Sequence, residues 1–344
     1  MKDKGDRAVG LWLLACAACV VAMVLVGGVT RLTRSGLSIT EWNPVAGALP
    51  PMGVHAWEEA FARYRATPEF QTVNTGMDLA AFQRIFLVEW GHRLLGRVAG
   101  LVFGVPLLVF AVKGRLRGAR LGKLAGIFGL GALQGAVGWW MVKSGLVDVP
   151  RVSPYRLATH LLFAIALLAL LVWHARDELD PAERAPGATG LARRLGALAI
   201  GAVVVTLTWG ALMAGLHAGH VAPTFPTMNG AWVPVGMGGI ERDALENPIT
   251  VHFVHRLLAY GTTAIVIAAA VSAWRATPDV LVRRRATWLV LLVAGQITLG
   301  ALTVLSHVRI DLASAHQVNA ALLLACAVAL VHRLRPGAEE AGAS

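Results

Sequence analysis

Long apolar segments constrain the fold of this chain more than any other feature. A helical segment of about 20 apolar residues, rising 1.5 Å per residue, crosses about 30 Å of hydrocarbon. The chain is 56% hydrophobic and only 15% charged. Apolar segments of this kind are predicted near residues 8–29, 84–112, 121–142, 156–174, 194–217, 250–274, 286–306 and 312–332. We therefore expect an all-α integral membrane protein with eight transmembrane helices.

The basic residues are distributed unevenly between the two ends of these segments. Eighteen of the 31 Lys and Arg residues lie at the two termini and in the connections after the second, fourth and sixth segments. Since such residues are retained on the cytoplasmic side during insertion, both termini are predicted to be cytoplasmic. The basic residues would there meet anionic membrane lipid, so the net charge of +11 requires no nucleic-acid partner. The first segment resembles a signal peptide but lacks a cleavage site of small residues, and we interpret it as a retained helix.

Two parts of the chain repeat one pattern. The sequence Glu-Trp-Gly-His-Arg-Leu-Leu at 89–95 matches His-Phe-Val-His-Arg-Leu-Leu at 252–258. The pairs His92 and His255, Gln134 and Gln296, and His160 and His316 are separated by 163, 162 and 156 residues. Each half holds four segments, so both halves enter the membrane in the same direction. The repeat predicts two parallel four-helix bundles, at 1–176 and 194–344, joined by a cytoplasmic linker at 177–193.

The four repeated histidines are candidate metal ligands. We expect all of them within about two turns of the outer ends of their segments, with His92 facing His160 and His255 facing His316. Buried imidazoles in apolar helices are costly unless they bind something, and two facing histidines per bundle suit a haem iron. Copper and zinc also accept imidazole, but zinc would be two ligands short, whereas haem supplies four of its own. For any single histidine, a hydrogen-bonded packing role is the alternative.

Charged residues near these histidines differ between the halves. Glu89 lies one turn before His92, and its counterpart in the second half is His252. A carboxyl group beside a haem can take up a proton or orient water, although Glu89 can instead pair with Arg93. Arg93, Arg97 and Arg256 lie near the same level and are candidate partners of haem propionates. The sequence assigns no role to His217, His220, His252 or His307.

Two long outer loops, from Arg31 to about Gln83 and from His220 to Pro248, are rich in aromatic residues or in Pro and Gly. We expect them to cap the outer ends of the two bundles. The stretch His55–Arg65 is amphipathic enough for a short helix at the membrane interface.

Several motifs are spread over the chain from about residue 10 to residue 333. They are Gly27 to Ser38, Glu89-Trp90-Gly91-His92-Arg93, Phe225-Pro226-Thr227-Met228, His255 to Tyr260, and His316-Gln317. Taken together, these motifs resemble those of the haem A synthases of the respiratory membrane. The resemblance is to the branch that lacks cysteine pairs in its outer loops, since no loop cysteine is present here.

The resemblance implies an enzyme that oxidises the C8 methyl of haem O to a formyl group through a hydroxymethyl haem, giving haem A for terminal oxidases. It implies that His255 and His316 bind a haem b cofactor, that His92 and His160 flank the substrate haem, and that Glu89 is the catalytic carboxylate. Haem O synthase and cytochrome oxidase assembly factors are expected partners, and the electron acceptor is not identified. The basic inner loops and the lack of a transit-like presequence favour a bacterial inner membrane.

Two other functions are compatible with the pattern of residues. Paired histidines at one depth also fit a two-haem transmembrane cytochrome of the b type that takes electrons from quinol. Parallel repeats occur in transporters as well, but the last four segments carry few charges at the middle of the membrane for a proton-coupled cycle.

Overall fold

The computed structural model describes residues 5–44, 46–147, 149–180, 185, 189–237 and 245–335. These residues are helical or irregular, and their only β-pairing is an isolated bridge between Met228 and Ala231. Eight helices are long and apolar enough to cross a membrane, which confirms the predicted all-α membrane class. They are α1 (Arg7–Leu32), α4 (Leu79–Val112), α5 (Gly118–Lys143), α6 (Pro154–Leu179), α7 (Gly190–Gly215), α9 (Pro248–Ala276), α10 (Val280–Leu305) and α11 (Ile310–Arg333).

Polar side chains mark where several of these helices begin. Asp78 accepts a hydrogen bond from the Ala81 amide at the start of α4, and Asp279 accepts one from the Val282 amide at the start of α10. Asn247 caps α9 through the Ile249 and Thr250 amides. Such caps satisfy amides that have no partner within the helix, so they fix the first turn.

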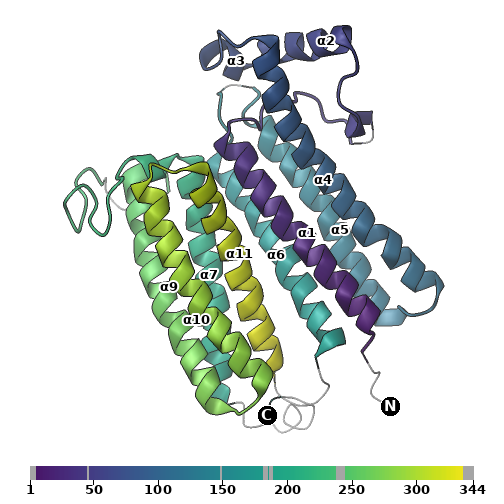
Figure 1. Ribbon diagram of the computed structural model, residues 1–344, viewed down its shortest axis with the longest axis vertical. Helices are drawn as coiled ribbons and strands as arrows, with labels where there is room; N and C mark the ends of the chain where they lie inside the picture. The colour runs from purple at the N-terminus through teal and green to yellow at the C-terminus, as the bar shows by residue number, and fades with distance from the viewer. Residues whose placement is uncertain are drawn as a thin grey trace. The chain divides into compact units, whose positions relative to one another are not determined.

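The chain divides into two compact units, Met1–Val21 with Ile165–Ser344, and Ala22–Ala164. In the first unit, α7 packs against α9 and α11, and α10 packs against the same two helices, so the four close into a bundle (Figure 1). Small residues such as Ala269, Ala270 and Ala273 of α9 are fully or almost fully buried in this unit. Small side chains let helix backbones approach closely, as membrane helices require. The predicted halves at 1–176 and 194–344 stay a prediction.

In the second unit, the short helices α2 (Val54–Arg65) and α3 (Pro68–Thr72) lie at one end of α4 (Figure 1). An aromatic cluster holds them there: Tyr64 of α2 stacks on Phe82 of α4 at 5.2 Å between ring centroids, and Trp57 meets Phe86 at 5.1 Å. Helix α2 confirms the helix expected at 55–65. Because its first two turns pack into this cluster, α4 begins at Leu79, earlier than the predicted residue 84.

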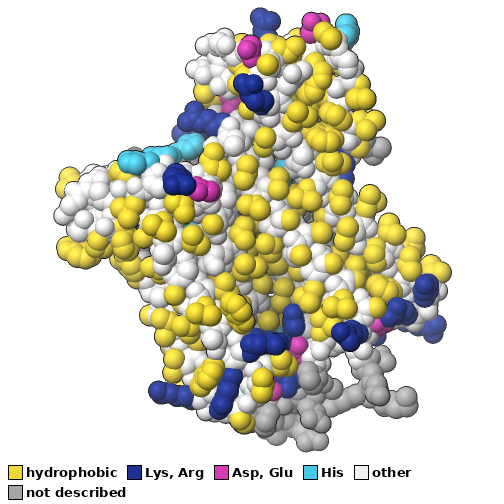
Figure 2. Space-filling view, in the orientation of Figure 1, with side chains coloured by type: hydrophobic (Ala, Val, Ile, Leu, Met, Phe, Trp, Pro, Cys, Tyr) yellow, Lys and Arg dark blue, Asp and Glu magenta, His cyan; other side chains and the backbone are white. Residues whose placement is uncertain are grey.

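On the face drawn in Figure 2, hydrophobic side chains cover much of the long helices and most charged side chains lie toward the helix ends. Large exposed apolar side chains on α4 include Leu101, Val105, Leu108 and Val112. A soluble protein of this size rarely exposes such continuous apolar surface, whereas lipid tails would cover it in a membrane.

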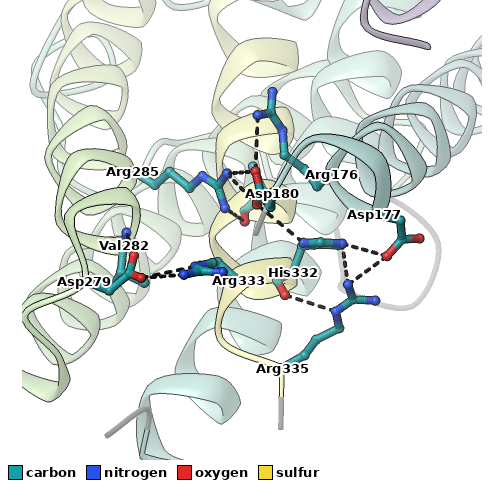
Figure 3. Close-up of polar contacts among 10 residues, drawn as sticks. Arg176, Asp177, Asp180, Asp279, Val282, Arg285, His332, Arg333 and Arg335 are labelled. Atoms are coloured by element: carbon teal, nitrogen blue, oxygen red, sulfur yellow. Dashed lines mark hydrogen bonds and ion pairs between the residues drawn. The ribbon is translucent and has the colours of Figure 1, made fainter. Parts of the chain in front are cut away.

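Ionic contacts tie the end of α6 to α10 and α11 within the first unit (Figure 3). Asp180, just beyond α6, receives both a 2.8 Å and a 2.7 Å hydrogen bond from Arg285 of α10. His332 of α11 lies 2.9 Å from Asp177, which also receives a 2.8 Å hydrogen bond from Arg335. A buried ion pair of this kind is costly to break, so it fixes the ends of these helices.

Candidate functional site

Each of the four repeated histidines packs its imidazole against a glycine of a neighbouring helix. A Cβ atom added to Gly27 of α1 would lie 3.2 Å from Nε2 of His92 in α4, and one added to Gly138 of α5 would lie 2.9 Å from Cε1 of His160 in α6. The first distance is tighter than most real Cβ contacts, and the second is shorter than real Cβ contacts reach. A larger residue in place of either glycine would therefore require the ring of His92 or His160 to shift.

The second set of histidines repeats this arrangement. A Cβ on Gly210 of α7 would lie 3.3 Å from Cε1 of His255 in α9, and one on Gly300 of α10 would lie 3.0 Å from Cε1 of His316 in α11. In each set, the helix that carries a histidine is preceded along the chain by a transmembrane helix that carries the matching glycine. His160 lies near His92, and His255 lies near His316, within the range of electrostatic interaction.

A glutamine contacts one histidine of each pair. Nε2 of Gln134 lies 3.5 Å from Nε2 of His160 and donates to the His160 carbonyl at 3.0 Å. Nε2 of Gln296 lies 3.2 Å from Nδ1 of His316. The two histidine pairs differ at the amide oxygen of this glutamine. Oε1 of Gln296 accepts a 2.7 Å hydrogen bond from Asn319, whereas Oε1 of Gln134 has no partner among the described residues.

The donor set fits a haem better than a bare metal ion. Nδ1 of His160 and Nδ1 of His255 are buried without a hydrogen-bond partner within the described ranges, so these imidazoles still have a nitrogen that is not engaged by protein. Among the residues that the structure describes, no three His, Cys, Asp or Glu side chains lie close enough together to hold a metal ion. A pair of histidines leaves zinc short of ligands, but it matches the two axial positions of a haem iron.

Glu89 is held from both sides. It is 2% exposed, and its Oε2 atom accepts hydrogen bonds from the Ser38 hydroxyl at 2.7 Å and from the Ile39 amide at 2.9 Å. Its Oε1 atom accepts from Nε of Arg93 at 3.1 Å and from Nη2 at 2.7 Å. The pairing with Arg93 that the sequence left open is therefore present. Four donors suit a carboxylate, which only accepts hydrogen bonds, and they fix its position one turn from His92.

Arg93 also binds the loop that precedes α2. Its Nη1 atom donates to the Glu41 carbonyl at 2.9 Å, and Nη2 donates to the Ile39 carbonyl at 3.0 Å. Arg97, one turn further along α4, donates to the Pro44 carbonyl at 2.7 Å and to the Asn43 carbonyl at 2.9 Å. Nη1 of Arg97 remains buried without a partner among the described residues, so it is still free to bind an anionic group.

The corresponding position of the second set carries a different polar pair. Nε of Arg256 donates to Nε2 of His252 at 3.1 Å, and His252 is fully buried. The two terminal nitrogens of Arg256 donate to loop carbonyls at 2.7 to 3.2 Å, those of Ala222, Thr224, Pro226 and Thr227. Every N–H group of Arg256 is thereby engaged, so this guanidinium holds the loop before α9 in place.

A second buried carboxyl group, which no sequence pattern predicted, lies in the α2–α3 segment. Glu69 is 4% exposed and accepts a 3.1 Å hydrogen bond from the Tyr64 hydroxyl, which in turn accepts one from Asn74 at 2.7 Å. Burial, opposed by the Tyr64 hydrogen bond and reinforced by the charge of Glu89, raises the pKa of Glu69 to about 7. Ser38 was part of a recognisable motif, but its bond to Glu89 spans 51 residues and depends on the fold.

His217, His220 and His307 stay without an assigned role. His217 and His307 adopt left-handed backbone conformations, with φ of 53° and 55°, at the turns that follow α7 and α10. These residues end helices, and neither is part of the glycine-packed pairs.

Comparison with known proteins gives one consistent result. The family model described as cytochrome oxidase assembly protein matches residues 10–328. The chain is 46% identical to a protein named heme A synthase from Azorhizobium caulinodans, over 94% of this chain and 93% of that protein. It is 46% identical to one of the same name from Rhodopseudomonas palustris, over 98% and 94%. It is 42% identical to another from Brucella anthropi, over 95% and 92%. No solved structure matches the chain.

Proposed function

We propose that the chain, which belongs to the family of cytochrome oxidase assembly proteins, oxidises the C8 methyl of haem O. Relatives that are 46% identical to it, over 93 to 98% of each chain, are named heme A synthase. The chain is accordingly an oxidoreductase that gives haem A by way of a hydroxymethyl haem. The observation that carries this assignment to particular residues is the packing of four histidines against glycines of neighbouring helices.

The two histidine pairs have different tasks in this proposal. His255 and His316 bind a resident haem b, which would supply electron transfer, while His92 and His160 flank the haem O substrate. The difference in polar surroundings supports this division, since Glu89 accompanies the first pair and the neutral ring of His252 accompanies the second. The matched glycine contacts also support descent of both pairs from one duplicated bundle.

Glu89 is the proposed catalytic carboxylate. Its four hydrogen bonds fix an acceptor one turn from His92, where it would stabilise positive charge or hold a proton close to the substrate methyl. Arg93 positions Glu89 and binds the loop, and Arg256 has the corresponding loop-binding role at the haem b site. Arg97 keeps the proposed role of propionate partner because its buried Nη1 has no partner in the described part of the chain.

The proposed location is a bacterial inner membrane, with both termini cytoplasmic and the histidine pairs toward the outer face. The distribution of Lys and Arg supports this orientation. Haem O would come from a membrane-bound haem O synthase, and haem A would pass to cytochrome oxidase assembly factors. Both haems are strongly apolar, so transfer within the membrane avoids exposing them to water.

The test compares two variants that each replace one carboxylate by an amide. In Glu89→Gln, an NH₂ group replaces one carboxylate oxygen and faces hydrogen-bond donors of the protein. We expect the rate of haem A formation to fall at least about tenfold, as loss of one charge-assisted hydrogen bond implies. Glu58→Gln makes the same charge change on an exposed residue of α2 and is expected to keep wild-type activity. The readout is haem A formed in membranes that contain haem O, together with the haem b absorption of the purified variants.

The proposal would be supported if Glu89→Gln keeps haem b but loses haem A formation, while the control variant keeps both. Wild-type product formation in Glu89→Gln would exclude a catalytic role. The second candidate function, a two-haem cytochrome, is favoured by the likeness of the two histidine pairs. It requires two permanently bound haems of the same type, and a first site that exchanges its haem would rule it out.

A further inference from the structure

A groove lies at the end of the first unit that carries most of its basic residues. It has a volume of about 430 Å³ and is lined by residues of α1, α6, α10 and α11. Arg176, Arg284 and Arg285 form its polar part, and apolar residues including Leu14, Val172 and Trp288 form the rest. Figure 2 shows Lys and Arg side chains gathered near this end of α10 and α11, next to hydrophobic surface.

Positive charge exceeds negative charge at this groove. Asp180 receives two hydrogen bonds from Arg285 and lies 3.6 Å from Nη1 of Arg176, as Figure 3 shows. The nearby Asp177 is engaged instead by His332 and Arg335. One carboxylate therefore balances three guanidinium groups.

Two of the arginines have unused hydrogen-bonding capacity. Nε of Arg176 is buried without a partner among the described residues. Arg284 is exposed at the rim, and within the described ranges no hydrogen bond or ion pair engages it. A buried N–H group without a partner is unfavourable, so an acceptor that reaches the groove would relieve this cost.

We propose that this groove binds an anionic phospholipid, with the headgroup phosphate between Arg284 and Arg176 and an acyl chain along the apolar wall. Guanidinium groups bind phosphate through paired N–H donors, and basic pockets between membrane helices at the cytoplasmic side suit anionic headgroups. The apolar residues of the groove favour a lipid over free phosphate, which would leave them bare. Trp288, which is 55% exposed, is placed as tryptophans at a membrane surface are. The site is independent of the histidine pairs and rests only on the proposed orientation.

The experiment measures lipid binding to purified, delipidated protein in detergent by native mass spectrometry. The probes are phosphatidylglycerol and phosphatidylcholine of the same chain length. We expect phosphatidylglycerol to bind at least about tenfold more tightly, and Arg284→Gln and Arg176→Gln each to weaken it about tenfold, as loss of one charge-assisted contact implies. Arg285 is left unchanged because its hydrogen bonds to Asp180 and to the Ala329 carbonyl hold the helices together.

The matched control is Arg275→Gln, which removes the same charge at the same end of the helices but outside the groove. Wild-type affinity for phosphatidylglycerol in this control, with weakened binding in the groove variants, supports the proposal. Equal affinity in Arg284→Gln and Arg275→Gln would overturn it, as would equal binding of phosphatidylcholine. Displacement of the lipid by millimolar inorganic phosphate would overturn the choice of a lipid as the occupant. Unchanged melting temperature and haem content of the variants would show that the fold is intact.

Discussion

At the scale of single residues, the glycines beside the histidines set the space in which the imidazole rings lie. A ligand histidine has to keep its ring at a fixed angle to a haem, and close packing against a backbone achieves this without another polar group. A histidine held in this way needs no large conformational change when it binds iron.

Replacing one of these glycines with alanine is expected to impair only the histidine pair that the glycine contacts. In Gly300→Ala the new Cβ would lie 3.0 Å from Cε1 of His316, so the ring must shift and haem b content should fall severalfold. In Gly138→Ala the Cβ would lie 2.9 Å from His160, so haem A formation should fall while haem b is kept. Gly135→Ala is the control, since nothing lies within 4 Å of its Cβ position. Equal haem content and activity in all three variants would show that the packing does not position the rings.

Sequence alone singled out the four histidines, Glu89 and the arginines as candidates, because spacing within one helix and a repeat are both visible in it. The sequence also offered an ion pair between Glu89 and Arg93 as an alternative, and this pair is present. The hydrogen bonds between these arginines and the loops could not be predicted. Arg93 and Arg256 donate to carbonyls 29 to 54 residues away, and main-chain carbonyls carry no sequence signal.

At the scale of the elements, the α2–α3 segment carries a pH-sensitive carboxyl group. The pKa of Glu69 is raised from 4.5 to about 7, so the native state holds a proton that the unfolded state releases. Its favourable contribution is present below about pH 4.5 and is lost as the pH rises through about 7. At 1.36 kcal/mol per pKa unit, the loss is at most about 3 kcal/mol.

We therefore expect Glu69→Gln to lack this loss of stability and to melt at a higher temperature than the wild type above pH 7. Near pH 4.5 the two proteins should melt at similar temperatures, because the wild-type carboxyl group is then neutral. Melting temperatures in detergent from pH 4.5 to pH 8 test this, with the exposed Glu58→Gln on α2 as the control. A constant difference between Glu69→Gln and the wild type over this pH range would contradict it.

One arginine binds four carbonyls of the loop before α9. Lysine has a single ammonium group and cannot reach four carbonyls at once, so Arg256→Lys is expected to loosen residues 222–231. Hydrogen exchange should accelerate about tenfold at the paired amides of Met228 and Ala231, whose mutual hydrogen bonds are 2.8 and 3.2 Å long. Arg275→Lys, at the opposite end of α9, should leave these rates unchanged. Unchanged rates in Arg256→Lys would mean that other contacts hold the loop.

At the scale of the whole molecule, the eight membrane helices were predictable because apolar length is a strong and local signal. The residues at which these helices begin and end were less predictable. Helix α4 begins at Leu79 because its first turns are covered by the aromatic cluster around Tyr64, which is a contact between distant parts of the chain. The ionic contacts of Asp177 and Asp180 with α10 and α11 were likewise hidden, since this stretch was interpreted only as the start of a linker.

In the proposed function, one histidine pair holds a resident haem b and the other holds a haem that is chemically changed. The measurement that decides this is mass-resolved chromatography of the haems extracted from the purified protein, expressed in a host that supplies haem O. We expect haem B together with haem O, its hydroxymethyl form or haem A. Haem B alone, at two per chain, would contradict it and would identify the protein as an electron-transfer cytochrome.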